Sequence, residues 1–179
     1  CLVDSWEVWD DFKPFALRPF GYRPVWVGYD PSSTGDAAGC VVVAPPAVPG
    51  GKFRILERHQ WKGGDFEAQA EAIRKLTERY TVTHVAIDTT GLGQGVYQLV
   101  KQFFPGVRGI NYSVESKVAM VMKAQSVIRA GRLEFERHGE FSSALITSST
   151  CRGNKYLSRP FSKCELGVAS STLRKNRMP

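Results

Sequence analysis

The chain has 179 residues, of which 42% are apolar and 23% are charged. This length predicts one domain with its own core, and this composition excludes a collagen-like repeat, a coiled coil and a chain that is disordered throughout. No apolar run is long enough to predict a membrane span, and no leader-like segment opens the sequence. Because the first residue is Cys1 rather than Met, we expect a piece of a longer protein.

The net charge of +7 is concentrated at the end of the chain. Residues 151–179 carry seven Lys and Arg against Glu165 alone, so the preceding 150 residues are close to neutral. Such a basic segment either contacts nucleic acid or is simply solvated, and the sequence leaves both open. Neither strand nor helix periodicity persists after about Ser142, so we expect residues 142–179 to be a basic tail without a stable fold of its own.

The cysteines predict no zinc site. They are widely spaced and form no C-x-x-C pair (Cys1, Cys40, Cys151 and Cys164). Scattered thiols of this kind indicate a reducing compartment. Cys40 begins an apolar run and is expected to be a small core residue.

The first part of the chain predicts three strands. We expect residues 1–24 to be a connector whose aromatic side chains cover apolar surface (Trp6, Trp9, Phe12 and Phe15). Apolar runs or alternation, with β-branched and aromatic residues, then predict strands at 25–30, 40–44 and 52–59. Segments rich in Pro, Ser and Gly separate these strands, which favours an antiparallel three-stranded meander.

Helices and strands alternate after Asp65. This residue is a predicted N-cap for a helix whose apolar positions recur every three or four residues. Strands are expected at 83–88 and 107–112, with a glycine-containing loop and a second helix between them that ends before Pro105.

A third helix is expected at 116–129, with its apolar stripe turned inward. The stripe comprises Val118, Val121 or Met122, Gln125 and Ile128. The complete order βββ-α-β-α-β-α predicts an α/β fold in which helices cover the faces of a mixed sheet.

Two aspartates follow two apolar strands, Asp30 after the first and Asp88 after the fourth. If these strands are neighbours, both carboxylates meet at one rim of the sheet, where their repulsion favours a divalent cation. Oxygen ligands without nearby His or Cys favour Mg²⁺ or Mn²⁺, which is the chemistry of a two-metal phosphodiesterase site. An aspartate at a strand end is also typical of an Asx-turn or a cap, and spacing alone favours that structural role.

Several separated segments resemble one known family. They are Trp26–Ser32, FRILERHQW at 53–61, and Ala86–Gly93 followed by Gly95–Tyr97. In order and spacing they resemble the C-terminal nuclease domain of the large subunit of tailed-phage terminases, the DNA-packaging motor proteins. The resemblance runs from about Cys1 to Glu140.

This resemblance implies a ribonuclease H-like fold and a metal-dependent endonuclease that cuts concatemeric phage DNA during genome packaging. It implies that Asp30 bridges two Mg²⁺ or Mn²⁺ ions and that Asp88 binds one of them. The implied partners are double-stranded DNA, the terminase small subunit and the portal, in the cytoplasm of the bacterial host and without a membrane.

The resemblance also implies a domain organisation. The family has an N-terminal ATPase domain, and this chain lacks that domain's phosphate-binding motif G-x-x-x-x-G-K-[S/T]. We therefore expect residues 1–24 to connect to a missing upstream ATPase domain and residues 25–141 to form the nuclease core.

The chain departs from the family pattern at the third acid. The family has an aspartate near the start of a C-terminal helix, whereas Asp88 is the last aspartate here. The later acids are all glutamates outside that helix context (Glu115, Glu134, Glu136, Glu140 and Glu165). Our hypothesis is that the chain leaves the family pattern near residues 142–150, through a frameshift, a degraded prophage copy or a divergent terminus, and that cleavage is weak or absent.

Two alternative functions remain open. One is a catalytically inactive nucleic-acid-binding or assembly module of the packaging motor. The other is a different ribonuclease H-like enzyme, such as a transposase or junction resolvase, which the segment Thr89–Gly91 argues against.

Basic residues on or just after the third helix are candidates for contacting DNA phosphates. They are Lys117, Lys123, Arg129 and Arg132. An exposed helix face explains them at least equally well. We expect His84 to be a packed or edge residue rather than a general base, and Asp36 to serve a hairpin turn rather than to bind a metal.

Overall fold

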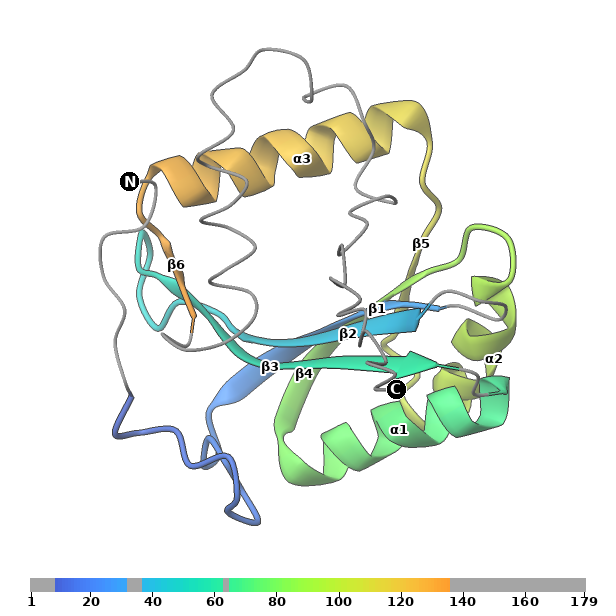
Figure 1. Cartoon of the computed structure of the whole chain (residues 1–179), viewed down its shortest axis with the longest axis horizontal. Helices are drawn as coiled ribbons and strands as arrows, with labels where there is room; N and C mark the ends of the chain where they lie inside the picture. Colours follow the sequence, from blue (N-terminus) through green and yellow to red (C-terminus); the bar gives the residue numbers. More distant parts are fainter. Residues whose placement is uncertain (1–8, 32–36, 63–64, 136–179) are drawn as a thin grey trace, which may run out of the picture.

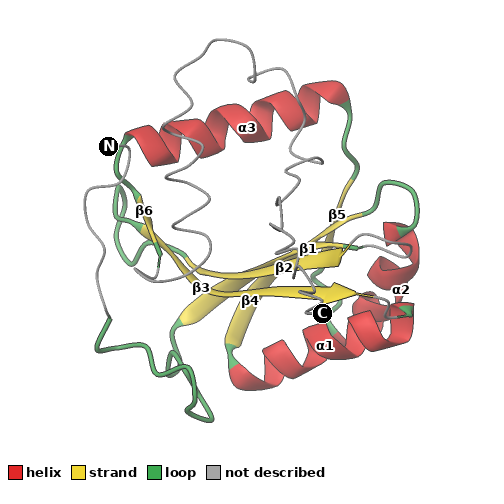
Figure 2. Cartoon of the chain, in the orientation of Figure 1, coloured by secondary structure: helices red, strands yellow, loops and turns green. Residues whose placement is uncertain are grey.

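The structure, a computed structural model, describes residues 9–31, 37–62 and 65–135. In this part of the chain a mixed six-stranded sheet runs in the order β5-β4-β1-β2-β3-β6, with α1 and α2 on one face and α3 across the other (Figures 1 and 2). The strands are β1 (Pro24–Asp30), β2 (Ala37–Ala44), β3 (Phe53–Lys62), β4 (Thr81–Asp88), β5 (Arg108–Ile110) and β6 (Leu133–Glu134). The helices are α1 (Phe66–Arg79), α2 (Gly93–Phe103) and α3 (Val114–Arg129). The predicted α/β class is confirmed.

The strand directions bring many strand ends to one side of the sheet. β1, β2 and β3 form the predicted antiparallel meander. β4 is parallel to β1, β5 is parallel to β4, and β6 is parallel to β3. Of the six strands described, only β2 therefore runs opposite to the others. The carboxyl ends of the parallel strands point towards the same edge of the sheet, which we call the rim.

The main core lies between the sheet and the layer formed by α1 and α2. Val25, Val27 and Tyr29 alternate along β1 with more exposed residues and are buried against this layer. Such alternation is expected of a strand with one face in the core. Cys40 is also buried in this core, as the sequence predicts.

Asp65 caps α1 as predicted. Its Oδ1 accepts a hydrogen bond of 2.7 Å from the backbone N–H of Ala68, which satisfies one of the donors that a helix start leaves unpaired. One turn into the helix, Gln69 accepts a hydrogen bond of 2.6 Å from the buried hydroxyl of Tyr29. The hydrogen bond links α1 to the residue that precedes Asp30.

The prediction that the apolar stripe of α3 is turned inward is wrong within the part of the chain described. No residue of α3 is buried, and Val118 and Met122 remain 53% and 64% exposed. The helix crosses above the sheet rather than packing down onto the described strands (Figure 1). Helical periodicity shows which side of a helix is apolar, but it does not show that a neighbouring element covers that side.

Smaller differences concern strand ends. β5 is shorter than the expected strand at 107–112, and β3 continues to Lys62. β6 was not predicted because a strand of two residues has no detectable periodicity. No described helix combines the length and hydropathy that crossing a bilayer requires.

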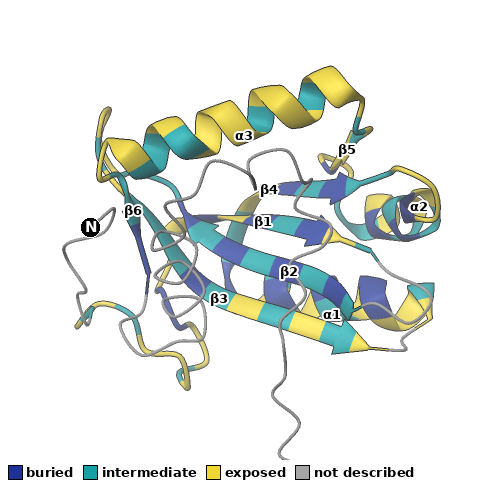
Figure 3. Cartoon of the chain, turned by 45° about the horizontal axis from the view of Figure 1, so that its top comes forward, coloured by how far each residue is buried: buried dark blue, intermediate teal, exposed yellow. Residues whose placement is uncertain are grey.

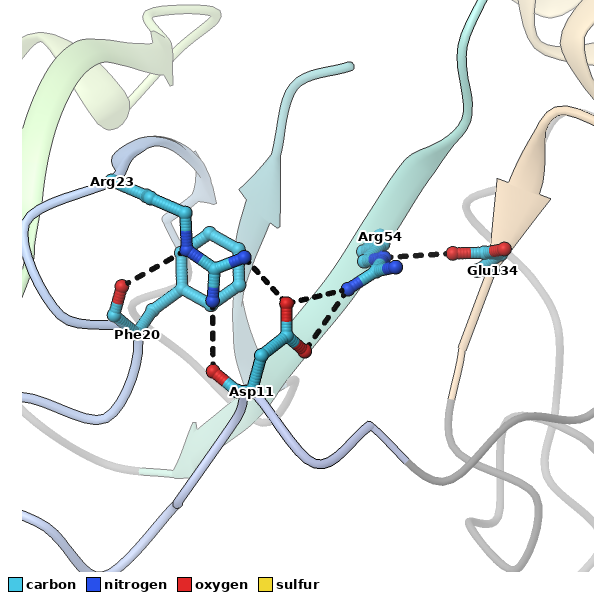
Figure 4. A network of polar contacts seen from close by, with 5 residues as sticks. All are labelled: Asp11, Phe20, Arg23, Arg54 and Glu134. Atoms are coloured by element: carbon cyan, nitrogen blue, oxygen red, sulfur yellow. Dashed lines mark hydrogen bonds and ion pairs between the residues drawn. The ribbon is translucent and has the colours of Figure 1, made fainter. Parts of the chain in front are cut away.

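The segment before β1 is held against the sheet by both apolar and ionic contacts. Trp9 and Phe12 pack against the core, as predicted for the connector, whereas Phe15 is fully exposed, contrary to prediction; Trp6 lies outside the described residues. Asp11 forms ion pairs with Arg23 and with Arg54 of β3 (Figure 4).

A second ionic group joins the edge strand β6 to β3. Glu134 is buried, and its two carboxylate oxygens pair with Arg54 and Lys52, each at 2.8 Å. Arg54 thereby connects Asp11 of the connector to Glu134 of β6 (Figure 4). The side chains draw three distant segments of the sequence together.

Glu57 of β3 anchors the end of α1. It accepts hydrogen bonds from the Tyr80 hydroxyl at 2.5 Å and from Arg79 at 3.0 Å, and it lies 2.9 Å from His59. Burial acts to raise the pKa of Glu57. The hydrogen bonds from His59 and Tyr80 and the charge of Arg79 outweigh burial and lower the pKa from 4.5 to about 2.

We expect Glu57 to make stability sensitive to acid. A carboxylate with a lowered pKa stabilises the fold above its unfolded pKa, and the contribution is lost as the pH falls from about 4.5 towards 2. Glu57→Gln should lower the free energy of unfolding at pH 7 by roughly 2–3 kcal/mol and flatten its pH dependence in that window. Urea denaturation at several pH values measures both effects. Glu71→Gln, which removes an exposed carboxylate 3.6 Å from Arg74, is the control and should change little.

Candidate metal centre

Asp30 and Asp88 end two neighbouring parallel strands. Tyr29 of β1 lies opposite Ile87 of β4, and both side chains are buried towards α1 and α2. Because successive side chains of a strand alternate between faces, the next residue on each strand points to the opposite side of the sheet. We call that side the acid face. The two carboxylates therefore meet at the rim.

The local environment disfavours charge on Asp30. Partial burial raises its pKa, the negative charge of Asp88 raises it further, and the ammonium group of Lys117 acts in the opposite direction. A carboxyl group whose pKa is raised by burial and by a second carboxylate belongs to a site in which a cation is electrostatically favoured. The effect of Lys117 on this pKa is smaller than that of burial or of Asp88, so Lys117 offsets the repulsion only in part.

Asp88 also has the structural role that its position in the sequence suggests. Its Oδ1 accepts a hydrogen bond of 2.8 Å from the backbone N–H of Thr90, two residues later. This hydrogen bond is that of an Asx-turn. A carboxylate has about four lone-pair sites, so accepting one N–H orients the group and leaves it able to bind a cation.

Tyr112 is a neighbour of the acid pair that the sequence analysis did not single out. It follows β5, the next parallel strand, and its backbone N–H donates to Thr90 Oγ1 at 3.0 Å. Its pKa is raised by burial and by the charges of Asp88 and Asp30. Lys117 Nζ lies 5.7 Å from the centre of its ring. The available signal was its place at the end of the strand expected at 107–112.

Gly93 allows α2 to start beside Asp88. A Cβ atom at this position would lie 1.8 Å from the carbonyl oxygen of Asp88 and 3.2 Å from Pro31 Cγ. Since the first contact is with backbone, the strand end would have to move. Gly93 and Gly95 both lie in the first turn of α2 rather than in the glycine-containing loop expected before it.

The other basic candidates lie away from the acid pair. Of the four, only Lys117 is close enough to act on the pKa of Asp30. Lys123 and Arg129 are exposed farther along α3. Arg132 lies at the far end, where its Nε donates to the Gly51 carbonyl at 2.9 Å.

The two minor candidates contribute little to the site. His84 is exposed and lies edge-on to Trp26, with ring centres 5.4 Å apart, which matches the expected edge residue. Asp36 lies outside the described residues.

The donor set fits a hard divalent cation. Mg²⁺ is commonly held by one or two protein carboxylates, with water and substrate oxygens completing its shell. In residues 9–31, 37–62 and 65–135, no three His, Cys, Asp or Glu side chains gather closely enough to hold an ion. Of the later glutamates, Glu134 is paired with Lys52 and Arg54, and Glu136, Glu140 and Glu165 lie outside the described residues.

The close approach at Gly93 leads to a test of the geometry. We expect Gly93→Ala to displace the end of β4, to lower the free energy of unfolding by about 1–3 kcal/mol and to weaken Mn²⁺ binding. Gly106→Ala is the matched control, since a Cβ there would meet only the Phe104 ring at 3.7 Å. Denaturant unfolding and calorimetric Mn²⁺ titration measure the two effects. Unchanged Mn²⁺ affinity in Gly93→Ala would show that this approach does not position Asp88.

Comparison with known proteins shows which family the chain matches. Residues 27–150 match the model of the terminase RNaseH-like domain. The chain is 62% identical over 149 residues to the terminase ATPase subunit of Escherichia phage P2, covering 83% of this chain and 25% of that protein. It is 48% identical over 136 residues to the probable terminase ATPase subunit of Haemophilus phage HP1, covering 75% and 22%.

Solved structures agree on the fold. The large terminase nuclease of the thermophilic phage G20c with bound magnesium aligns with a TM-score of 0.56 at 16% identity, covering 70% of this chain and 61% of that one. The large terminase of bacteriophage HK97 aligns with a TM-score of 0.52 at 13% identity, covering 66% and 31%. The chain spans about a quarter of the length of its curated relatives. With most of its length matched by the family model, the chain belongs to the terminase RNaseH-like domain family.

Proposed function

We propose that this chain is the nuclease domain of a phage terminase large subunit and that Asp30 and Asp88 bind divalent cations for cutting concatemeric phage DNA during genome packaging. The observation that carries the proposal is the convergence of these two acids at adjacent parallel strand ends, in a chain of the terminase RNaseH-like family. The G20c nuclease has been solved with magnesium, cobalt and zinc, which supports a divalent cation here.

The chain's own residues suggest how the site acts. Asp30 and Asp88 would hold Mg²⁺ or Mn²⁺, and two such ions supply an activated water and stabilise the leaving oxygen. The Lys117 ammonium lies where it can neutralise a phosphate bound beside Asp30. The raised pKa keeps the Tyr112 hydroxyl protonated, so this group can donate a hydrogen bond to a phosphate oxygen.

The larger context is part of the same proposal. Two curated relatives are ATPase subunits that are about four times longer than the matched region. We infer that residues 1–24 connect to an upstream ATPase domain, that 25–141 form the nuclease core, and that 142–179 are a basic tail. Double-stranded DNA, the terminase small subunit and the portal are the proposed partners, in the cytoplasm of the host bacterium.

Metal binding tests the acid pair directly. Asp30→Asn and Asp88→Asn should each weaken Mn²⁺ binding about tenfold or more, because each removes a charged ligand from a site that has few. Isothermal titration calorimetry measures the affinity. Asp65→Asn makes the same change of charge at the cap of α1, where asparagine also caps well, and should bind Mn²⁺ as the wild type does.

Cleavage is tested separately, because the described residues supply two acids and the family pattern has three. We expect slow or undetectable nicking of supercoiled plasmid with Mn²⁺, in the full chain. Mn²⁺ binding without nicking would favour the alternative, an inactive nucleic-acid-binding or assembly module. Robust nicking that Asp30→Ala abolishes would contradict the expected impairment.

A further inference from the structure

The second half of β3 carries an exposed polar row, Arg58, Gln60 and Lys62, which we call the β3 row (Figure 3). The residues that alternate with this row along β3 point towards α1. Glu57 accepts a hydrogen bond from the Tyr80 hydroxyl, and the Trp61 ring lies 5.8 Å from that of the core residue Tyr29. Because side chains alternate along a strand, the β3 row projects from the acid face.

The sheet register places this row level with the acid pair. Asp30 lies opposite Gly39 of β2, and Gly39 lies opposite Gln60. At the usual strand spacing, the row is ~10 Å from Asp30 across the sheet, and Arg58 and Lys62 are ~13 Å apart along β3. Arg58 and Lys62 therefore lie on either side of the position on β3 that is level with the acid pair.

Among the described residues, no side chain of β2 stands between the β3 row and Asp30. The intervening residue on β2 is Gly39, and a Cβ atom there would meet nothing within 4 Å. α3 leads away from this area, since β6, which follows it, pairs only with Phe53 and Arg54 at the start of β3. In the described part of the chain, the surface between the β3 row and Asp30 is therefore open, and we call this surface the shelf.

Positive charge flanks the acid pair on both sides. Lys117 Nζ lies 5.7 Å from the centre of the ring of Tyr112, which follows β5 on one side of the acid pair, and Arg58 and Lys62 lie across Gly39 on the other side. Cations on either side of a metal-binding acid pair complement a polyanion whose backbone crosses that pair. Gln60, between the two cations, has an amide that donates to phosphate oxygens.

We propose that the β3 row binds the phosphate backbone of duplex DNA and forms, with Lys117, the two sides of a track that leads the backbone over Asp30 and Asp88. This inference rests on the proposed nuclease function. It assigns DNA contact to the second half of β3, beyond the two residues that pair with β6, whereas the basic candidates expected from the sequence lie on or just after α3. Charged residues on an edge strand also discourage pairing with other chains, which is the competing explanation.

Binding of a fluorescent 30-base-pair duplex to the full chain tests the row without requiring cleavage. Anisotropy is measured in Ca²⁺ between 50 and 200 mM salt for the wild type and for the double variant Arg58→Gln/Lys62→Gln. If both residues contact phosphates, the slope of log affinity against log salt falls by roughly two, and affinity at 50 mM salt falls about tenfold or more. Lys62→Gln alone should lower the slope by about one.

The control variant also removes two positive charges, but from the helices on the opposite face of the sheet. Lys75→Gln/Lys101→Gln changes two exposed lysines of α1 and α2 and leaves the basic tail intact, so it should keep nearly the wild-type slope. Gly39→Val adds bulk to the shelf without changing charge and should weaken DNA binding while preserving the melting temperature. Circular dichroism of all variants confirms folding.

The outcomes separate this inference from the proposed function. Equal slopes in the row variant and the lysine control, or DNA binding unaffected by Gly39→Val, would overturn the track. A wild-type chain that binds no duplex would overturn it as well. Failure of the proposed function would give a different result, namely Mn²⁺ binding that Asp30→Asn and Asp88→Asn do not weaken.

Discussion

Two like charges held side by side dominate the chemistry of this protein. The parallel pairing of β1 with β4 brings Asp30 and Asp88 together, although burial and the charge of Asp88 disfavour the ionised form of Asp30. The core contacts behind the pair maintain this arrangement: Tyr29 bonds to Gln69 of α1, and Gly93 lets α2 begin against the Asp88 carbonyl. The stability of the sheet thus offsets a repulsion that a bound cation would relieve.

The structural and the chemical interpretations of Asp88 prove to be compatible. Its position before Thr-Thr-Gly is typical of an Asx-turn, and the hydrogen bond from Thr90 forms that turn. The same hydrogen bond fixes the orientation of the carboxylate at the rim. A residue that ends a strand in a defined conformation is therefore well placed to be a ligand, because it loses little conformational freedom when an ion binds.

The sequence was most informative where local patterns and burial agree. Apolar runs that end in an acid predicted the first and fourth strands, and Asp65 with the stripe after it predicted α1. The inward face of α3 could not be predicted, since amphipathicity does not reveal whether another element covers it. The β3 row was missed because its position beside Asp30 depends on the register across Gly39, and register is a non-local property.

The common direction of five strands has a consequence for engineering the site. Ile110 at the end of β5 is the register partner of Asp88, and the two side chains share one face of the sheet. A donor grafted onto a terminal position of this kind would reach the existing pair without altering any residue of the main core. The architecture separates the residues that stabilise the core from those at the rim, so ligands could be added at the rim without changing the core.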